Sequence, residues 1–398
     1  MVGVQALKKL DPAAWTGLLA HHSNGTPLRV AAVQAEPIGR RQSRFLLWLE
    51  AHSEPIALLG KQTGATEARF YHDLAGRLPE LTPRCWYSHV SGDRSWVVLD
   101  EVVNDFPARR WMPADLERVI RELAQLHATF WQEGESLHGL GLSRLLDDGA
   151  GRRIPVLDAE VPLDGLELEP AAVALSAHSR RRFGPLAALM QEASVGLRQL
   201  YDVGGWPGIF EEAHIQAAAE LLDDPVPMLF PLSQQPATLL HGDPAAHNWH
   251  LSVLGEYKLL NWDQAAVGPG LVDLITFIEQ FALLRLEAGG WPAWNEWQVL
   301  EETMEDGYIL TMGRLLGSRF SPAAARQAIP AARCLYVLSY WLPIFAHWLS
   351  LPHDRELWRN LNAQSDANWD RSGFGQMARL RPHLAGVFRR FLEARYAL

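Results

Sequence analysis

The stretch that decides the fold is LLHGDPAAHNWH, residues 239–250, followed by YKLLNWDQAAVGPGLVDL, residues 257–274. His-Gly-Asp-Pro cannot continue a helix or a central strand, because proline lacks a backbone N–H and clashes with the preceding turn. We therefore expect a sharp loop between two apolar runs, presenting Asp243 and Asn248. A short hairpin then returns Asn261 and Asp263 to the same region of the chain.

A carboxylate and an amide on one bent loop, with further acidic groups behind them, suit metal-assisted phosphoryl transfer. The carboxylate orients a hydroxyl nucleophile, while the amide and a second acid hold Mg²⁺ against the phosphates. A lone aspartate in a turn is more often a turn cap. Asn248 and the downstream acids favour the functional interpretation of Asp243.

Composition limits the class of protein. The chain has 398 residues, 48% hydrophobic and 21% charged, with a net charge of −10, which fits a folded protein of two or three domains. The absence of a dense Lys/Arg stripe argues against a nucleic-acid partner. Two cysteines, Cys85 and Cys334, argue against a disulfide scaffold and a thiolate zinc site. The N-terminus has no long apolar stretch, so we expect no secretory signal and a cytoplasmic location.

One segment tests the soluble interpretation. Residues 334–351, CLYVLSYWLPIFAHWLSL, contain no Asp, Glu, Lys or Arg, and 18 residues is the lower limit for a membrane span. Pro343 and His347 interrupt the segment, and it has no counterpart elsewhere. We therefore expect a buried core helix and no membrane partner.

The N-terminal third predicts an antiparallel sheet with one helix. Strands are expected at 28–38, 44–51, 56–61, 83–90 and 95–102, and a helix at 66–78. Residues 114–133 then form a strong amphipathic helix. After an irregular stretch at 140–170, helices are expected near 171–222 and from the hairpin to the end. The sequence thus predicts an α+β fold with two domains, residues 1–103 (nucleotide-binding sheet plus helix) and 104–398 (helical, with the loop and substrate cleft).

HGDPAAHN fits the H-x-D-x-x-x-x-N loop of the aminoglycoside phosphotransferase and choline-kinase-like family, which has the protein-kinase-like fold. LAQLHATFW (123–131), VVLDEV (97–102) and LLNWDQAAVGPGLVDL (259–274) resemble the helix before that loop, the inter-lobe linker and the metal-binding strand. The resemblance extends over roughly residues 25–350. It implies a two-lobed kinase that uses ATP or GTP with Mg²⁺.

The resemblance also implies roles for individual residues. Asp243 would accept or orient the proton of the substrate hydroxyl, and Asn248 would ligate Mg²⁺. His241 would brace the loop, and Asp273 would accept hydrogen bonds from the loop backbone. The linker would bring Asp100 and Val102 to the nucleotide.

Two features of the predicted sheet bear on phosphate binding. Lys61 ends an apolar strand and would reach the α- and β-phosphates, and Glu67 lies on the apolar stripe of the following helix. We therefore expect a Lys61–Glu67 ion pair that holds the lysine. In the first strand connection, Gly39 with Arg40 or Ser43 either touches phosphates or belongs to a plain hairpin turn.

The sequence departs from the family at one position. The family delivers an aspartate as D-W-[ED], whereas this chain has Asn261-Trp262-Asp263, and hard cations favour charged ligands. Asp263 could take over, since residues 261 and 263 share one side if the strand continues that far. Alternatively, the chain is a kinase-fold binding or regulatory protein (a pseudokinase), or Asn261 was introduced to trap a complex. The predicted metal ligands are thus Asn248, Asn261 and Asp263, with His247 and His250 interpreted as structural or substrate-side residues.

The substrate side is less defined. An aromatic-lined cleft would suit a cation or an amphiphilic hydroxyl compound. At least five of seven C-terminal tryptophans are expected to be core residues instead: Trp291, Trp294, Trp297, Trp341, Trp348, Trp358 and Trp369. We expect transfer of a γ-phosphoryl group to a small-molecule hydroxyl, and the sequence leaves the acceptor and the oligomeric state open.

Overall fold

The structure is a computed structural model that describes residues 10–20, 28–50, 52–92, 94–146, 186–287, 294–363 and 374–398. The chain divides into two compact units. Unit 1 comprises Met1–Trp111, Gly139–Leu142 and His247–Ala265, and unit 2 comprises Met112–His138, Ser143–Ala246 and Ala266–Leu398. Each unit is described by itself.

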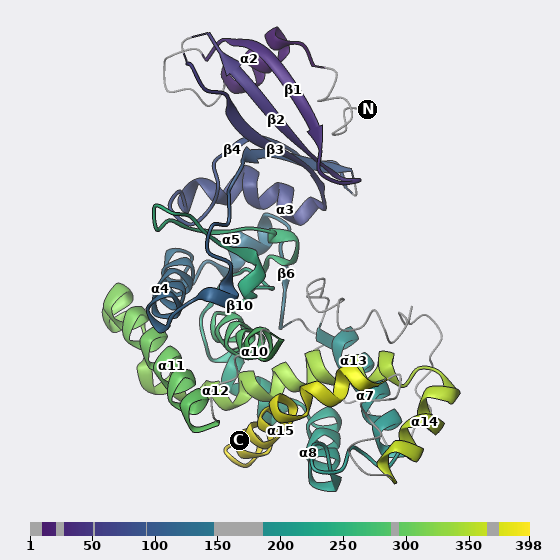
Figure 1. Ribbon diagram of the computed structural model, residues 1–398. Helices are drawn as coiled ribbons and strands as arrows, with labels where there is room; N and C mark the ends of the chain where they lie inside the picture. Colours follow the sequence, from purple (N-terminus) through teal and green to yellow (C-terminus); the bar gives the residue numbers. More distant parts are fainter. Residues whose placement is uncertain are drawn as a thin grey trace. The chain divides into compact units, whose positions relative to one another are not determined.

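Unit 1 is built on a five-stranded sheet in the order β1-β2-β3-β5-β4, in which all neighbours are antiparallel (Figure 1). Its strands are β1 (Val30–Pro37), β2 (Gln42–Leu49), β3 (Ile56–Thr63), β4 (Cys85–His89) and β5 (Ser95–Asp100). The predicted strands and their antiparallel pairing are confirmed, with ends that differ by a few residues.

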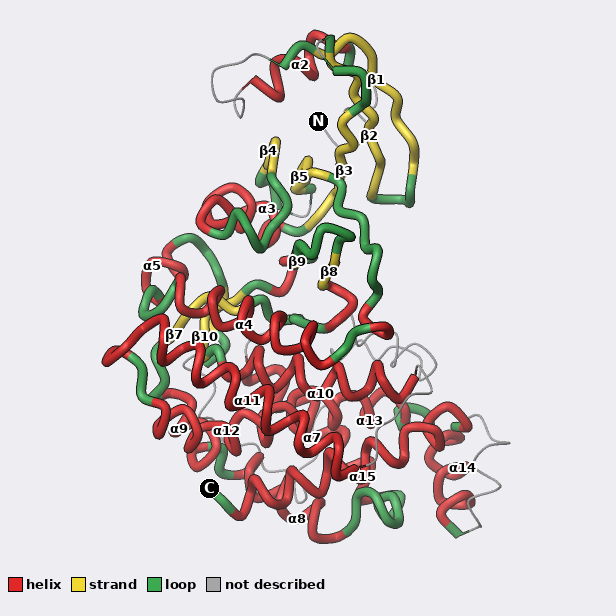
Figure 2. The backbone as a smooth tube through the Cα atoms, turned by 60° about the vertical axis from the view of Figure 1, so that its left-hand side comes forward, coloured by secondary structure: helices red, strands yellow, loops and turns green. Residues whose placement is uncertain are grey.

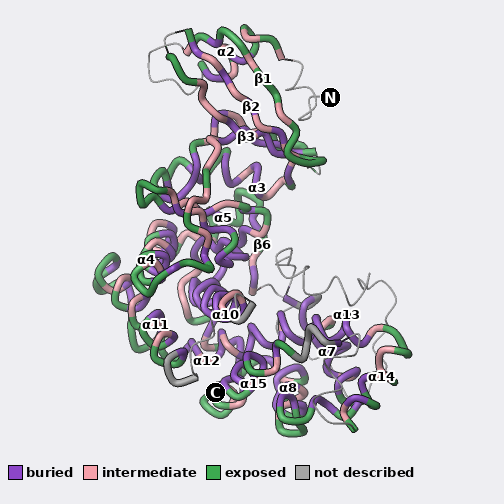
Figure 3. The backbone as a smooth tube through the Cα atoms, in the orientation of Figure 1, coloured by how far each residue is buried: buried purple, intermediate pink, exposed green. Residues whose placement is uncertain are grey.

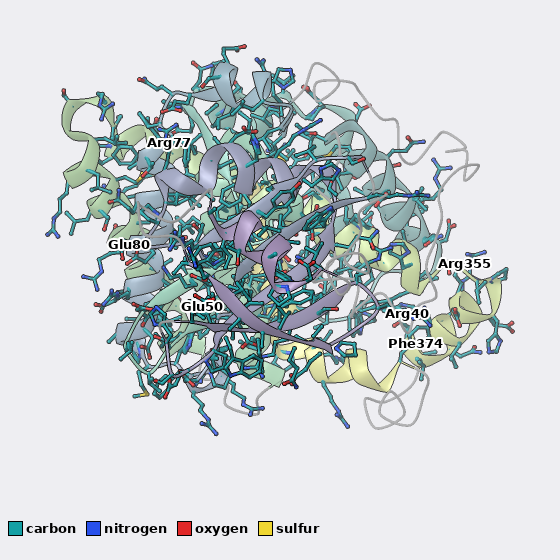
Figure 4. The ribbon with its side chains drawn as sticks, turned by 90° about the horizontal axis from the view of Figure 1, so that it is seen from above. Arg40, Glu50, Arg77, Glu80, Arg355 and Phe374 are labelled. Carbon is teal, nitrogen blue, oxygen red and sulfur yellow. The ribbon has the colours of Figure 1, made fainter. Side chains whose placement is uncertain are left out.

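Alternation along β2 explains how the sheet buries one face. Phe45, Leu47 and Leu49 are buried while the residues between them are partly exposed, as expected for side chains that point alternately to opposite faces. They pack with Trp15 and Leu19 of the helix α2 (Pro12–Ala20) in one apolar cluster. Figure 4 shows Arg40 and Glu50 at opposite ends of β2.

A helical segment follows β3 directly, as α3 (Ala65–Arg69), η1 (Phe70–Leu74) and η2 (Ala75–Arg77). This confirms the helix predicted at 66–78. Unit 1 also contains the hairpin of β8 (Trp249–Leu251) and β9 (Tyr257–Leu259), whose register pairs Trp249 with Leu259. The Leu259 N–H donates to the Leu81 carbonyl at 2.8 Å, which ties the hairpin to the segment after η2.

Unit 2 is mostly helical (Figure 2). Its helices are α4 (Pro113–Thr129), α5 (Gly134–Gly139), α7 (Leu186–Asp202), α8 (Glu212–Asp223), α9 (Val226–Ser233), α10 (Leu271–Glu287), α11 (Trp294–Leu316), α12 (Pro322–Tyr336), η8 (Val337–Trp341), α13 (Leu342–Trp348), α14 (Pro352–Asn362) and α15 (Gly375–Tyr396). A small sheet in the order β6-β10-β7 joins them, from β6 (Ser143–Arg144), β10 (Ala266–Pro269) and β7 (Ala237–Leu240).

The apolar segment at 334–351 lies in the core of unit 2. Of the described residues, Pro322–Trp348 is a helical run long and apolar enough to cross a membrane, but 83% of its most apolar window is buried inside the protein. Figure 3 shows a similar concentration of buried residues along α10. The burial agrees with the core helix expected from the sequence.

The predicted α+β class is confirmed, with an antiparallel sheet first and a helical region second. The predicted boundary after residue 103 stays a prediction. The compact units break after Trp111, and His247–Ala265 belongs to unit 1, although the sequence placed it with the helical domain. The β8–β9 hairpin explains this difference, because the Asp105 N–H also donates to the Leu251 carbonyl at 3.0 Å. Most of the irregular stretch predicted at 140–170 lies outside the described residues.

Candidate active site

The loop after β7 is held in place by a buried carboxylate. Gly242 has φ = +83°, a conformation that residues with a Cβ rarely adopt, so glycine is required between His241 and Asp243. The carboxylate of Asp273 accepts hydrogen bonds from the His241 N–H at 2.6 Å and the Gly242 N–H at 3.1 Å. These are the loop-backbone hydrogen bonds expected from the sequence.

Two further side chains of unit 2 fix Asp273. Nε2 of His127, on α4, lies 3.4 Å from Oδ2 of Asp273, and Nδ1 of the same ring lies 2.7 Å from the hydroxyl of Tyr308 on α11. His127 and Asp273 are fully buried. A Cβ on Gly270 would lie 2.5 Å from His127 Nδ1 and 2.6 Å from the Tyr308 hydroxyl, so only glycine fits this close approach. We call His127, His241, Asp273 and Tyr308 the Asp273 cluster.

Asp243 is held by the loop rather than lying free on the surface. Its backbone N–H donates to Nδ1 of His241 at 3.2 Å, so His241 braces the loop as expected. The residue is only 4% exposed, which is unusual for a solvated turn cap. The chain then passes from unit 2 into unit 1 at His247, and Asn248 follows at the end of η5 (Ala246–Asn248).

A second polar cluster surrounds Lys61 in unit 1. Its Nζ lies 2.7 Å from Oε2 of Glu67, donates to Oδ1 of Asn261 at 2.9 Å, and lies 3.6 Å from Oδ2 of Asp263. The predicted Lys61–Glu67 ion pair is therefore formed. Its short sequence separation is sufficient because α3 begins two residues after β3 ends, which puts Glu67 in the first helical turn.

The hairpin delivers Asn261 and Asp263 by a turn and not by a strand. The sequence argument put both on one side if the strand continued to Asp263, and that condition is not met, because β9 ends at Leu259. Asn261 adopts the left-handed conformation (φ 62°, ψ 62°), which asparagine tolerates better than most residues, and Trp262–Gln264 forms a 3-10 turn. Both side chains nevertheless reach Lys61. The Asn261 Nδ2 also donates to Oδ1 of Asn248 at 2.7 Å.

Packing and a hydroxyl fix this turn. Trp262 is fully buried and stacks on Phe70 of η1, with ring centroids 3.7 Å apart and planes 8° apart. The hydroxyl of Thr63 lies 2.6 Å from Oδ1 of Asp263 and also contacts Oε2 of Glu67. We call Lys61, Thr63, Glu67, Asn248, Asn261 and Asp263 the Lys61 cluster.

The Lys61 cluster carries one more negative than positive charge when its groups are ionised. Burial disfavours the charged lysine, but Glu67 and Asp263 outweigh it and raise the pKa of Lys61. Burial raises the pKa of Glu67 despite the opposing effect of Lys61. For Asp263, burial again favours the neutral form, but Lys61 and Thr63 bring the pKa below its ordinary value. The Asp263 side chain is 41% exposed, whereas that of Glu67 is buried.

The donor set fits a divalent cation that takes most of its ligands from elsewhere. In the described part of the chain, no three His, Cys, Asp or Glu side chains form a group able to hold a metal ion, which also disfavours a zinc site at His247 and His250. Magnesium in nucleotide enzymes commonly needs only one or two carboxylates, with phosphates and waters completing the shell. Asp263, with the amide oxygens of Asn248 and Asn261, meets that requirement at its lower limit.

The remaining predicted residues make other contacts. Asp100 accepts a hydrogen bond from the Trp86 indole at 2.6 Å, and the Val102 carbonyl lies 3.2 Å from Nδ1 of His250. Both line a cavity of about 800 Å³ in unit 1, between η1, the segment after β5 and the β8–β9 hairpin. The Gly39 N–H donates to the Gln42 carbonyl at 3.3 Å, as in a plain hairpin turn.

The tryptophans of unit 2 do not support an aromatic-lined cleft. Trp297, Trp341, Trp348 and Trp358 are all buried in the core. Trp291 and Trp369 lie outside the described residues, as does the side chain of Trp294.

Sequence reasoning missed three residues of these clusters. Thr63 lies two residues after Lys61 on the same strand, so its position on the same face could have been inferred. His127 interrupts the apolar stripe of α4, which is a weak signal for a buried polar contact. Nothing in the sequence around Tyr308 indicates its contact with His127.

Comparisons with known proteins give likeness at the level of whole structures. Neither a protein-family model nor a curated protein sequence matches the chain. Among similar solved structures, a spectinomycin phosphotransferase is 13% identical (98% of this chain and 99% of that chain, TM-score 0.42). A choline kinase from Cryptosporidium parvum is 10% identical (92% and 98%, TM-score 0.43). A macrolide 2'-phosphotransferase from Brachybacterium faecium is 15% identical (88% and 98%, TM-score 0.37).

The names of these three structures are those of small-molecule phosphotransferases and kinases. The matches cover most of each chain, but all three TM-scores are below 0.5.

Proposed function

We propose that the protein is an ATP- or GTP-dependent phosphotransferase that moves the γ-phosphoryl group to a hydroxyl of a small molecule. The observation that carries this proposal is the segment from His241 to Asn248, which has one residue in each cluster at its two ends. The Asp273 cluster holds the segment with Asp243, and five residues later Asn248 enters the Lys61 cluster. Asp243 supplies a fixed carboxylate, and Lys61 supplies a fixed positive charge. Such groups suit a reaction in which positioning and charge neutralisation dominate.

Each residue then has a defined task. Asp243 orients the acceptor hydroxyl and accepts its proton as the oxygen attacks. Lys61, held by Glu67, binds the α- and β-phosphates, and Asn248, Asn261 and Asp263 would hold Mg²⁺. The metal, when bound, would neutralise phosphate charge during transfer. Asp273 and His241 keep Asp243 in place without contacting the substrate.

A second candidate function is a binding or regulatory protein with little turnover. The specific observation in its favour is Asn261, a neutral amide where the family has an aspartate. Its amide is engaged on both sides, by Lys61 and by Asn248. Loss of one full charge beside a divalent ion weakens binding by about 1 kcal/mol even in a highly screened setting.

A transfer assay decides between the two functions. Purified protein is incubated with γ-phosphate-labelled ATP or GTP, Mg²⁺ and a panel of aminoglycosides, amino alcohols and sugars. We expect labelled product with at least one class of acceptor, and Asp243→Asn to reduce transfer by about 10²–10⁴-fold. Asp306→Asn, on an exposed surface of unit 2, is the matched control and should keep full activity.

Two results would count against the proposal. Nucleotide binding without transfer to any acceptor and without hydrolysis would favour the second candidate function. Transfer that is unchanged in Asp243→Asn would remove Asp243 from the reaction.

A further inference from the structure

Thr63 occupies a particular place in unit 1. It is the last residue of β3, two positions after Lys61, so both side chains point to the same face of the sheet. Only 6% of the residue is exposed. Its hydroxyl lies between two carboxylates, 2.6 Å from Oδ1 of Asp263 and in contact with Glu67.

The two oxygens of Asp263 have different neighbours. With Oδ1 held by Thr63, the second oxygen, Oδ2, lies 3.6 Å from Lys61 on a side chain that is 41% exposed. Asn261 has no comparable freedom, because its Oδ1 accepts from Lys61 and its Nδ2 donates to Asn248. Of the two carboxylates in the Lys61 cluster, the more exposed one, Asp263, thus lies two residues beyond the position of the family's aspartate.

We propose that Thr63 is a positioning residue that holds Asp263 as the carboxylate ligand of a divalent cation, beside the amides of Asn248 and Asn261. The inference rests on the proposed function, because it concerns the metal of the same site. In this proposal, Asp263 supplies the negative charge that Asn261 lacks. The hydroxyl of Thr63, which is not part of the loop motif, orients the Asp263 carboxylate.

The competing explanation is that Thr63 only satisfies buried carboxylates at the end of a strand. Groups that orient a metal ligand typically change metal affinity by 10–100-fold when removed. A purely structural hydroxyl would instead change stability, and would affect nucleotide binding equally with and without metal. The two explanations therefore differ in a measurable quantity, the metal dependence of binding.

The test uses four variants of the full chain. Thr63→Val removes the hydroxyl with little change in shape, and Thr63→Ser keeps it. Asp263→Asn removes the charge itself. Thr66→Val makes the same change as Thr63→Val at a half-exposed threonine of α3 and is the matched control. Thermal unfolding of each variant checks that the fold is retained.

Three titrations are made for each protein, with Mn²⁺ alone, with ADP in Mg²⁺ and with ADP in EDTA. We expect Thr63→Val and Asp263→Asn to weaken Mn²⁺ and Mg²⁺·ADP binding by about tenfold or more. ADP affinity in EDTA should change less than about twofold in Thr63→Val, and Thr63→Ser and Thr66→Val should behave as the unmodified protein.

The outcomes separate the inference from the proposed function. Wild-type metal affinity in Thr63→Val or Asp263→Asn would overturn the inference, as would equal losses of ADP affinity in Mg²⁺ and EDTA. If ADP binds with no benefit from metal, the inference fails while a nucleotide-dependent function remains. If Mn²⁺ binds through Asp263 but ADP does not bind at all, the proposed function fails while the assignment of Thr63 and Asp263 stands.

Discussion

The Lys61 cluster of unit 1 and the Asp273 cluster of unit 2 are built from similar polar groups but differ in the exposure of their carboxylates. In the Asp273 cluster, one carboxylate is fully buried and receives two backbone N–H donors. In the Lys61 cluster, one lysine is shared among two carboxylates and an amide, and Asp263 keeps an exposed edge. The Asp273 carboxylate is fully buried among its partners. The Lys61 cluster carries one more negative than positive charge when its groups are ionised.

This difference in exposure predicts different roles for the two clusters, one in stability and one in ligand binding. A buried carboxylate whose hydrogen bonds are all internal stabilises one conformation of the loop, and its loss leaves buried donors without acceptors. A half-exposed carboxylate next to a cation contributes less to stability because water screens it. Substitutions in the Asp273 cluster should therefore act mainly on folding, and those in the Lys61 cluster mainly on ligand binding.

The largest expected effect is on the buried cluster. Asp273→Ala removes the acceptor of the His241 and Gly242 N–H groups and the partner of His127. We expect the free energy of unfolding to fall by about 3–5 kcal/mol, measured by urea denaturation. Because the lost bonds are internal, Mg²⁺·ATP should not specifically restore this loss.

Asp306→Ala is the matched control for that substitution. Asp306 pairs with Arg326 on the surface, with side chains 69% and 57% exposed, so its loss should cost less than about 1 kcal/mol. Equal effects of the two substitutions would remove the distinction between the clusters.

A smaller effect is expected in the open cluster. Asn261→Asp removes the donor to Asn248 and adds a third carboxylate near Lys61. Without ligand, we expect the protein to lose about 1 kcal/mol of stability, the typical contribution of one hydrogen bond. With Mg²⁺·ATP, the added charge should tighten binding about fivefold, equivalent to about 1 kcal/mol.

Thermal unfolding with and without Mg²⁺·ATP measures both parts of this prediction, since a ligand stabilises the folded state according to its concentration relative to the dissociation constant. An Asn261→Asp protein that is destabilised equally in both conditions would show that position 261 acts only as scaffold.

Local patterns in the sequence predicted much of this architecture. Alternation along β2, the apolar stripe of α4 and the His-Gly-Asp-Pro turn each follow from a few neighbouring residues, and each was found as expected. The Lys61–Glu67 pair was also accessible, because strand and helix periodicities place both groups on known faces.

Contacts between distant segments were beyond such reasoning. Tyr308 meets His127 across 181 positions of sequence, and Thr63 meets Asp263 across 200, with no periodicity linking them. The left-handed turn at Asn261 was missed for a related reason. Its conformation depends on Trp262 stacking on Phe70, which the apolar run before it does not reveal.

The central claim is that Lys61 and its neighbours bind a nucleotide with a divalent metal. Calorimetric titration of ATP tests it most directly, in Mg²⁺ and in EDTA, with the unmodified protein, Lys61→Met and Lys258→Met. Lys258 belongs to the same unit but donates to the Pro79 and Glu80 carbonyls, so it is the matched lysine. We expect saturable binding that weakens in EDTA and in Lys61→Met, and that is unchanged in Lys258→Met. No binding, or equal affinity in all three proteins, would contradict it.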